Sequence, residues 1–292
     1  MARKDSDYAR LIQRVRRLEL TSNRLIDTLF SGQYRSVFRG PGIEFDEVRE
    51  YSDGDDARLI DWNVTSRMDR AFSKTYREER EMLLFLLVDI SGSMRPFEGM
   101  ETRFDTETTL LALLTFAAIR NNDRVGAAFF SDRIEHWIPP LKGKKHGLRI
   151  IQDALSVQPE GRGSDLSLAL RTVGESLPRR GICVVLSDFK TSNYYQELRL
   201  LARKHDTVAI RIVDALDIEF PRSGLLQLED PESGREILAA GTNAYRNDYR
   251  YFWQIHRRQW LRECGRRGVS ALEVRTDEDP ASRLIRFFRH RR

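Results

Sequence analysis

An aspartate and two serines follow the most apolar segment of the chain. Leu83–Val88 is entirely apolar and leads into Asp89, with Ser91 and Ser93 at two-residue spacing. Such a run is typical of a buried strand in a parallel sheet, and open α/β sheets bind ligands at the carboxyl ends of their strands. Oxygen ligands clustered there can hold Mg²⁺. The segment therefore predicts a loop with metal-binding chemistry at the edge of a sheet.

Two other segments supply side chains of the same kind. Gly161–Asp165 is a loop that presents Ser164 just before a predicted helix, and Cys183–Ser187 is a second predicted strand that leads into Asp188. If the two strands are neighbours, the two aspartates lie at strand ends about 4.8 Å apart, so that both can face one ion. The predicted ligand set is Asp89, Ser91, Ser93, Ser164 and Asp188.

These three loops resemble the metal-ion-dependent adhesion site of the von Willebrand factor A domain. That site combines Asp-x-Ser-x-Ser with a threonine on a second loop and an aspartate on a third, and the loops here follow in the same order. Ser164 stands where the pattern usually has threonine, and it keeps the hydroxyl. The resemblance covers about residues 80–290. It implies an Mg²⁺ site, with Mn²⁺ or Ca²⁺ as alternatives, that recognises an acidic side chain of a partner protein.

A second resemblance covers the segment upstream. The runs Gly40–Tyr51 and Gly54–Trp62 are similar to a segment of the bacterial domain of unknown function 58 family, in which it precedes a von Willebrand A-like domain. Members are commonly encoded beside MoxR-type AAA+ ATPases. The resemblance implies an adaptor or co-chaperone that acts with such an ATPase or its client, by association alone. Many members begin with membrane helices, and this chain resembles the short type without them.

The wider sequence pattern predicts the fold that positions these loops. Segments with strand and helix patterns alternate from residue 82 onward, which favours a Rossmann-like (von Willebrand A-type) α/β fold with a mostly parallel sheet and helices on both faces. The expected strands are 82–89, 123–131, 134–138, 181–187, 207–213 and 269–274, and the expected helices are 103–121, 145–156, 165–177, 193–204, 243–265 and 280–289. The pair 123–131 and 134–138 predicts a hairpin, and hence one antiparallel edge strand.

A change of composition near residue 80 predicts a domain boundary. Residues 1–80 combine a helical pattern over 8–30 with an acidic and aromatic segment of short strands and irregular structure. In that segment, Asp61-Trp62 is expected to anchor the turn at Gly54-Asp55-Asp56 through a buried ring and a hydrogen bond. Residues 81–292 form the expected von Willebrand A-like domain, with a β-hairpin insertion near 217–241. The aromatic side chains of 243–265 are expected mostly to face the core, and a partner groove is the alternative.

Composition excludes several classes of protein. The longest apolar stretch, Met82–Val88, is far shorter than the roughly 20 residues that span a membrane, and the charged N-terminus has no apolar signal segment, so we expect a cytoplasmic protein. The net charge of +5 and the basic tail argue only weakly for nucleic acid, because no basic strand studded with aromatic residues accompanies them. Cys183 and Cys264 are expected to be free structural thiols.

Enzymatic alternatives to the binding hypothesis are poorly matched. A haloacid-dehalogenase phosphatase requires a second aspartate where Ser91 stands, no phosphate-binding P-loop is present, and the histidines lack zinc-site spacing. We therefore expect a protein that is not an enzyme. The alternative is a hydrolase in which the same ion activates water, with Asp165 as the nearest general base.

Overall fold

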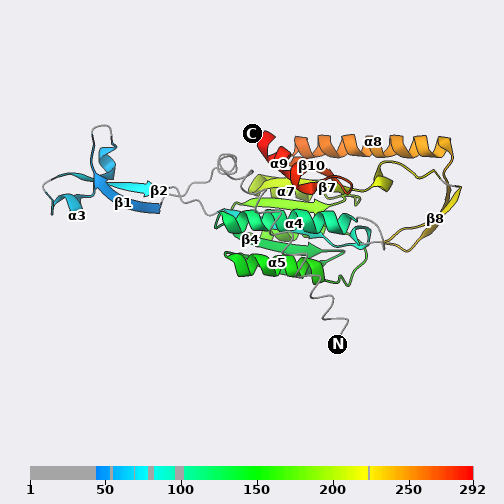
Figure 1. Ribbon diagram of the computed structural model, residues 1–292, viewed down its shortest axis with the longest axis horizontal. Coiled ribbons are helices and arrows are strands. Elements are labelled where there is room, and N and C mark those ends of the chain that lie inside the picture. Colours follow the sequence, from blue (N-terminus) through cyan, green and yellow to red (C-terminus); the bar gives the residue numbers. More distant parts are fainter. Residues whose placement is uncertain are drawn as a thin grey trace, which may run out of the picture. The chain divides into compact units, whose positions relative to one another are not determined.

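The computed structural model describes residues 44–52, 55–68, 70–77, 82–95, 102–222 and 224–291 (Figure 1). The helix expected over 8–30, and the part of the upstream motif before residue 44, lie outside these residues. The chain divides into two compact units, one within Phe38–Met82 and the other containing Leu83–Arg292.

The smaller unit is built on an antiparallel pair of strands, β1 (Glu44–Glu50) and β2 (Phe72–Arg77). Between them lie the short helices η1 (Ala57–Leu59) and α3 (Trp62–Thr65), and Asp61 caps α3 by accepting the N–H groups of Asn63 and Val64. The side chain of Trp62 is 70% exposed, so the prediction that its ring anchors a turn from a buried position is wrong. Asp61 does form hydrogen bonds, but with the first turn of α3.

The larger unit is built on a six-stranded sheet whose strands follow the order β10-β7-β6-β3-β4-β5. All neighbouring strands are parallel except β4 and β5, which confirms the predicted antiparallel edge strand. The strands are β3 (Leu83–Asp89), β4 (Arg124–Phe130), β5 (Ile134–Leu141), β6 (Ile182–Ser187), β7 (Asp206–Val213) and β10 (Ser270–Arg275).

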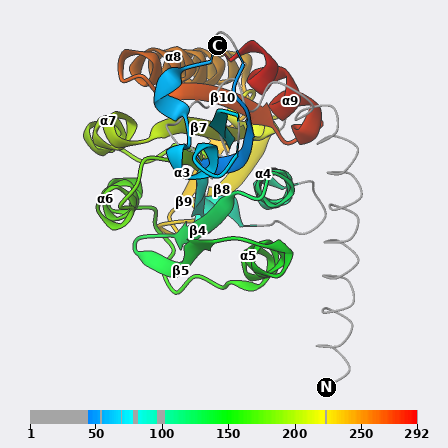
Figure 2. The same cartoon turned by 90° about the vertical axis from the view of Figure 1, so that its left-hand side faces the viewer.

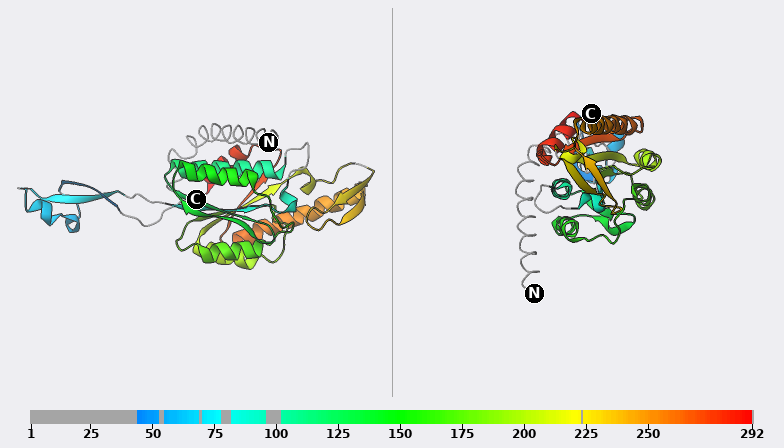
Figure 3. Two further views of the ribbon diagram at one scale, coloured as in Figure 1. Left: turned by 90° about the horizontal axis from the view of Figure 1, so that it is seen from below. Right: turned by 90° about the vertical axis from the view of Figure 1, so that its right-hand side faces the viewer.

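Helices cover both faces of this sheet, as predicted (Figure 2, Figure 3). One face carries α4 (Arg103–Arg120), α5 (Lys144–Ser156) and α9 (Pro280–His290), and the other carries α6 (Leu166–Ser176), α7 (Tyr195–Lys204) and α8 (Asn243–Arg266). Because both faces are covered, the central strands β3 and β6 are apolar up to the polar residues at their carboxyl ends, and all their residues except the half-buried Leu83 are buried. Each fully buried Leu, Val or Phe of these strands stabilises the fold by about 1.5–3 kcal/mol. The strand ends therefore form a rigid platform.

A β-hairpin, β8 (Leu225–Glu229) and β9 (Glu236–Ala240), lies between β7 and α8 in the chain. Its turn is closed by backbone hydrogen bonds of Asp230 with Arg235 and Gly234. Gly234 has a φ of 68°, a left-handed conformation that glycine adopts without steric cost.

Helix α8 differs from the sequence prediction. Its buried side chains are Arg246, Trp260 and Cys264, whereas Tyr251 and Phe252 are 67% and 51% exposed. The prediction that its aromatic residues mostly face the core is therefore wrong. The reason is that the N-terminal half of α8 extends beyond the strands, and only its C-terminal half packs on the sheet (Figure 1).

Two smaller expectations can be compared with the structure. Cys183 and Cys264 are free and buried, as predicted. Within the described parts of the chain, no helix has both the length and the apolar character needed to cross a membrane.

Candidate metal site at the carboxyl ends of the central strands

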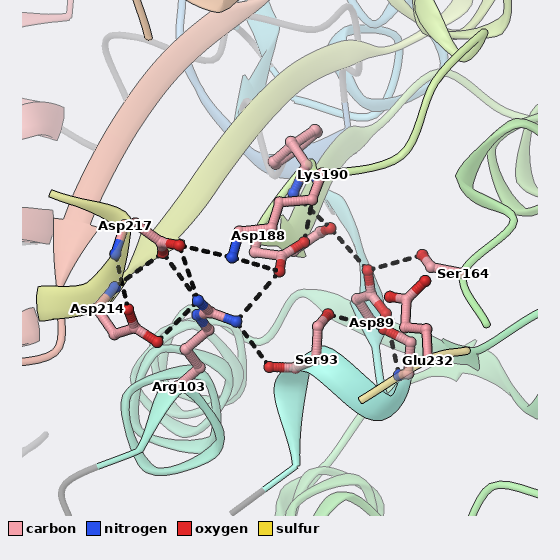
Figure 4. Close-up of polar contacts among 12 residues, drawn as sticks. Asp89, Ser93, Arg103, Ser164, Asp188, Lys190, Asp214, Asp217 and Glu232 are labelled. Carbon is pink, nitrogen blue, oxygen red and sulfur yellow. Dashed lines mark hydrogen bonds and ion pairs between the residues drawn. The ribbon is translucent and has the colours of Figure 1, made fainter. Parts of the chain in front are cut away.

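The structure brings the five predicted residues to one end of two neighbouring strands. Asp89, Ser93, Ser164 and Asp188 are labelled in Figure 4. β3 and β6 are paired in parallel, with Val88 opposite Leu186, so Asp89 ends one strand and Asp188 directly follows the other. Ser91 and Ser93 lie on the loop after β3, which forms the short helix η2 (Gly92–Met94), and Ser164 lies on the loop before α6. The predicted neighbourhood of the two aspartates is thus confirmed.

Asp89 is at the centre of the polar contacts. Its side chain is wholly buried, and its Oδ1 accepts the backbone N–H of Ser91 at 3.0 Å. Its Oδ2 accepts hydroxyls from Ser164 at 3.1 Å and from Ser187 at 2.7 Å. The Oγ atoms of Ser91 and Ser93 lie 3.3 Å apart. Hydroxyls from three segments of the chain therefore converge on one carboxylate or on one another. Ser187 was not among the predicted residues.

Backbone hydrogen bonds fix the loops that carry these hydroxyls. The N–H of Gly92 donates to the carbonyl of Arg162 at 2.8 Å, which joins the loop after β3 to the loop that presents Ser164. The hydroxyl of Thr191 donates to the carbonyl of Ser164 at 3.2 Å, which joins that loop to the one after β6. The three loops are therefore held together before any ligand binds.

Asp188 has a different environment from Asp89. Its Oδ2 lies 3.3 Å from Nη1 of the buried Arg103, and its Oδ1 accepts the backbone N–H of Lys190 at 3.1 Å. Arg103 also pairs with Asp214 at 2.7 Å and with Asp217 at 2.9 Å, and Lys190 Nζ lies 2.5 Å from Asp217. These cations partly neutralise Asp188, whereas no described residue forms an ion pair with Asp89.

Asp89 and Glu107 are buried carboxyl groups without a cationic partner among the described residues. Burial, followed by the charge of Asp188, raises the pKa of Asp89 to about 6. Glu107, a buried residue of α4, accepts a backbone hydrogen bond from Asp89, and burial together with Asp89 and Asp188 holds its pKa well above the usual value. One carboxyl oxygen of Glu107 has no hydrogen-bond partner among the described residues. The raised pKa values mean that these carboxyl groups tend to hold protons when no cation is near, and a bound divalent cation would replace those protons and stabilise the ionised form.

The tip of the β8–β9 hairpin adds Glu232, which lies beside Asp89 and Ser164 (Figure 4). Glu232 accepts a hydrogen bond from the Ser93 side chain, and burial, followed by Asp188 and Asp89, raises its pKa to about 7. The preceding residue packs tightly on the site, because a Cβ at Gly92 would come within 2.4 Å of the Pro231 carbonyl oxygen. The sequence pattern of this turn indicates a hairpin but not where its tip lies.

A metal site built only from acids, histidines and cysteines is not present in the described part of the chain: no group of three or more such side chains is arranged to hold an ion there. The candidate site is of another kind, with two carboxylates and three hydroxyls as its predicted donors. Hydroxyl and carboxylate oxygens are the hard ligands that Mg²⁺ and Ca²⁺ prefer.

Comparisons with known proteins give the family but no activity. An uncharacterised protein of Mycobacterium tuberculosis strain H37Rv, Rv1480, is 30% identical over 295 residues, which cover all of this chain and 93% of the relative. The solved structures of an aerotolerance-related membrane protein from Bacteroides fragilis and of the conserved hypothetical protein BatB from Bacteroides thetaiotaomicron are similar at TM-scores of 0.46 and 0.44. Both are 14% identical, and the matches cover 72% and 71% of this chain and 98% and 97% of those chains. The family model described as "Protein of unknown function DUF58" matches residues 47–259. The chain therefore belongs to the DUF58 family.

Proposed function

We propose that this protein is a von Willebrand A-type interaction module that binds a divalent cation, with Mg²⁺ as the leading candidate, and recognises an acidic side chain of a partner protein through that ion. The observation that carries the proposal is the environment of Asp89. This buried carboxylate gathers hydroxyls from separate loops and lies beside other acids, yet has no cationic partner among the described residues.

The residues that would hold the ion are Asp89, Ser91, Ser93, Ser164 and Asp188. The ion would supply an electrophilic coordination position, since two carboxylates balance a 2+ charge and the hydroxyls are neutral ligands. Glu107 would lie behind Asp89, and a bound cation would lower its raised pKa by favouring the ionised carboxylate. Arg103 would hold Asp188 in place through its ion pair and would reduce the charge that this aspartate offers to the ion.

The position of Glu232 supports an acidic side chain as the group that the partner presents to the ion. Glu232 is the acid that the chain itself places against this set of hydroxyls and carboxylates. An acidic side chain of a partner would take the same position after the hairpin tip has moved. From the family resemblance, we propose a MoxR-type AAA+ ATPase or its client as that partner, and an adaptor or co-chaperone as the role of this protein.

No observation favours the hydrolase alternative. The residue expected to act as its general base, Asp165, accepts the backbone N–H of Leu168 at 2.8 Å and so caps α6. A capping carboxylate is committed to the helix terminus.

Calorimetric titration of Mg²⁺ or Mn²⁺ tests the metal site. We expect saturable binding to the wild-type protein and a loss of about 100-fold or more in Asp89→Asn, because this change keeps the size of the side chain and removes a ligand charge. The matched control is Asp132→Asn, which changes an exposed aspartate paired with Arg133. Equal affinities of wild type and Asp89→Asn for the metal ion would refute the assignment of Asp89 as a metal ligand.

A second experiment tests recognition through the ion. Immobilised wild-type protein is mixed with a purified MoxR-type ATPase from the same genome, with Mg²⁺ or with a chelator. We expect capture only with Mg²⁺ and no capture by Asp89→Asn. Capture that is unchanged in the chelator would contradict metal-mediated recognition, even if the protein binds the metal.

A further inference from the structure

A cavity of roughly 680 Å³ is lined by the loop after β6, the start of α7 and the middle of α8. Its lining combines aromatic residues, among them Tyr194, Phe252, Trp253 and Trp260, with polar side chains and with Arg211 from β7. Cavities of this size that combine apolar walls with a few polar groups are typical of sites for small ligands.

Arg211 is a buried cation of this cavity whose environment indicates an anionic ligand. Only 5% of this residue is exposed, and no described residue forms an ion pair or hydrogen bond with its side chain. Its guanidinium lies 5.9 Å from the ring centroids of both Trp253 and Trp260, so its contacts are with aromatic rings. A buried cation is normally paired with an anion, because leaving its charge unpaired in a protein interior is costly.

The residues around Arg211 offer donors but no acid. The described residues that line the cavity include neither Asp nor Glu. The indole Nε1 of Trp260 is buried and has no hydrogen-bond partner among the described residues. Lys190, the other Lys or Arg in the lining, is engaged with Asp217 at 2.5 Å. The cavity thus presents a guanidinium without an ion-pair partner among the described residues, together with the unpaired indole N–H groups of Trp253 and Trp260, to a ligand that enters it.

We propose that this cavity binds a carboxylate carried by an aromatic or branched apolar body, with Arg211 as the anion-binding residue. A single guanidinium balances a singly charged carboxylate, which its fork of N–H donors also fits in shape, whereas a phosphate dianion would require a second free cation. The rings of Phe252, Trp253 and Trp260 would contact the apolar body. The proposal is independent of the metal site, since none of the five predicted metal ligands lines the cavity.

Tryptophan indole resonances in a ¹H–¹⁵N NMR spectrum offer a direct test. The chain has four tryptophans, of which Trp253 and Trp260 line the cavity while Trp62 and Trp137 lie elsewhere and serve as internal references. The probe is N-acetyl-phenylalanine, and its matched control is N-acetyl-phenylalaninamide, which has the same ring without the charge. We expect saturable shifts of the Trp253 and Trp260 signals alone, with affinity for the acid greater than for the amide by about tenfold or more.

Variants assign the charge to its residue. Arg211→Met keeps the apolar stem and should bind the acid no better than the amide, whereas Arg199→Met, an exposed change on α7, should bind like wild type. Equal affinity of wild type for acid and amide, or full affinity in Arg211→Met, would overturn the proposal. If Arg211→Met does not fold, the contrast between acid and amide in the wild-type protein still decides.

The same assay distinguishes two sources of the carboxylate. A short peptide that ends in phenylalanine is compared with N-acetyl-phenylalanine, each as the free acid. Tighter binding of the peptide would identify the carboxyl terminus of a polypeptide as the ligand, and equal binding would identify a small organic acid. Either result supports the carboxylate site, and binding of neither acid would refute it.

Discussion

Replacing Glu232 by glutamine should weaken binding of a divalent ion by about 10- to 100-fold. A carboxylate 4 Å from a 2+ ion attracts it by about 8 kcal/mol at an effective dielectric constant of 20. Glu232 is only partly buried, and it must be dehydrated and brought beside Asp89 and Asp188 to bind the ion. These costs offset most of the attraction, and a net effect of about 1.4–2.8 kcal/mol remains, which corresponds to the stated change in affinity.

Terbium luminescence separates a direct ligand from a distant charge. Tb³⁺ takes the oxygen ligands of hard cations, and its lifetimes in H₂O and D₂O report how many waters coordinate it. If Glu232 contacts the ion, Glu232→Gln should bind Tb³⁺ more weakly and with more coordinated water than wild type. Glu229→Gln, an exposed change on the same hairpin, should match wild type in both respects.

Two results would refute this reasoning at different points. An unchanged affinity and an unchanged water count in Glu232→Gln would show that Glu232 is not a ligand, while the site of Asp89 would stand. A wild-type protein that binds neither Tb³⁺ nor Mg²⁺ would refute the metal site itself. Weaker affinity with an unchanged water count would mean that Glu232 acts only through its charge.

Three further changes test the contacts around the site and the fold. Gly92→Ala should raise the number of waters that coordinate Tb³⁺, as Glu232→Gln does, because the new methyl group would displace the Pro231 carbonyl. Gly163→Ala should leave that number unchanged, because its methyl group has space. Equal water counts in the two variants would contradict the tight contact. Arg103→Met should lower the free energy of unfolding by about 3–5 kcal/mol in urea titrations, since it leaves Asp217 buried with less compensation. Arg133→Met, which removes an exposed ion pair, should have a much smaller effect, and similar losses in the two variants would show that the Arg103 cluster is not stabilising. Burial, followed by the charges of Lys204 and Arg180, lowers the pKa of His205 to about 4, and its Nδ1 accepts the N–H of Gly181. The stability that the neutral ring contributes is therefore fully present above pH 6.5 and is lost as the pH falls toward 4, by about 2 kcal/mol at pH 5. His205→Asn should reduce this loss in urea titrations at pH 7 and pH 5, and an unchanged pH dependence would contradict the prediction.

The positions of Asp89 and Asp188 could be predicted because the underlying signal is local. Each follows an apolar run that only a buried strand accommodates, and parallel strands place their carboxyl ends at the same edge of a sheet. Ser164 could be placed because a glycine-containing loop before a helix is equally local. The alternation of strands and helices likewise predicts a mostly parallel sheet with helices on both faces.

The remaining residues near Asp89 depend on tertiary contacts that no local pattern encodes. Glu107 belongs to a helix, and its helical periodicity does not tell which buried position faces the strand ends. Glu232 approaches from a hairpin whose direction is set by packing of Pro231 on Gly92. The exposure of the aromatic residues of α8 could not be predicted for a similar reason. Periodicity predicts one apolar face but not that half of the helix extends beyond the sheet.

The hairpin gives the proposed site a competitor that is part of the same chain. A tethered carboxylate such as Glu232 has an effective concentration set by its tether, in the millimolar range or above for short connections, whatever the protein concentration. A carboxylate of the partner must compete with this tethered one. The partner's apparent affinity is therefore reduced by the fraction of molecules in which the hairpin tip is docked. Dilution or overexpression would leave this threshold unchanged. A single carboxylate that binds weakly would then not displace the tip. A partner that also binds the outer surface of the hairpin would be favoured, because its contacts with the hairpin would contribute to displacing the tip.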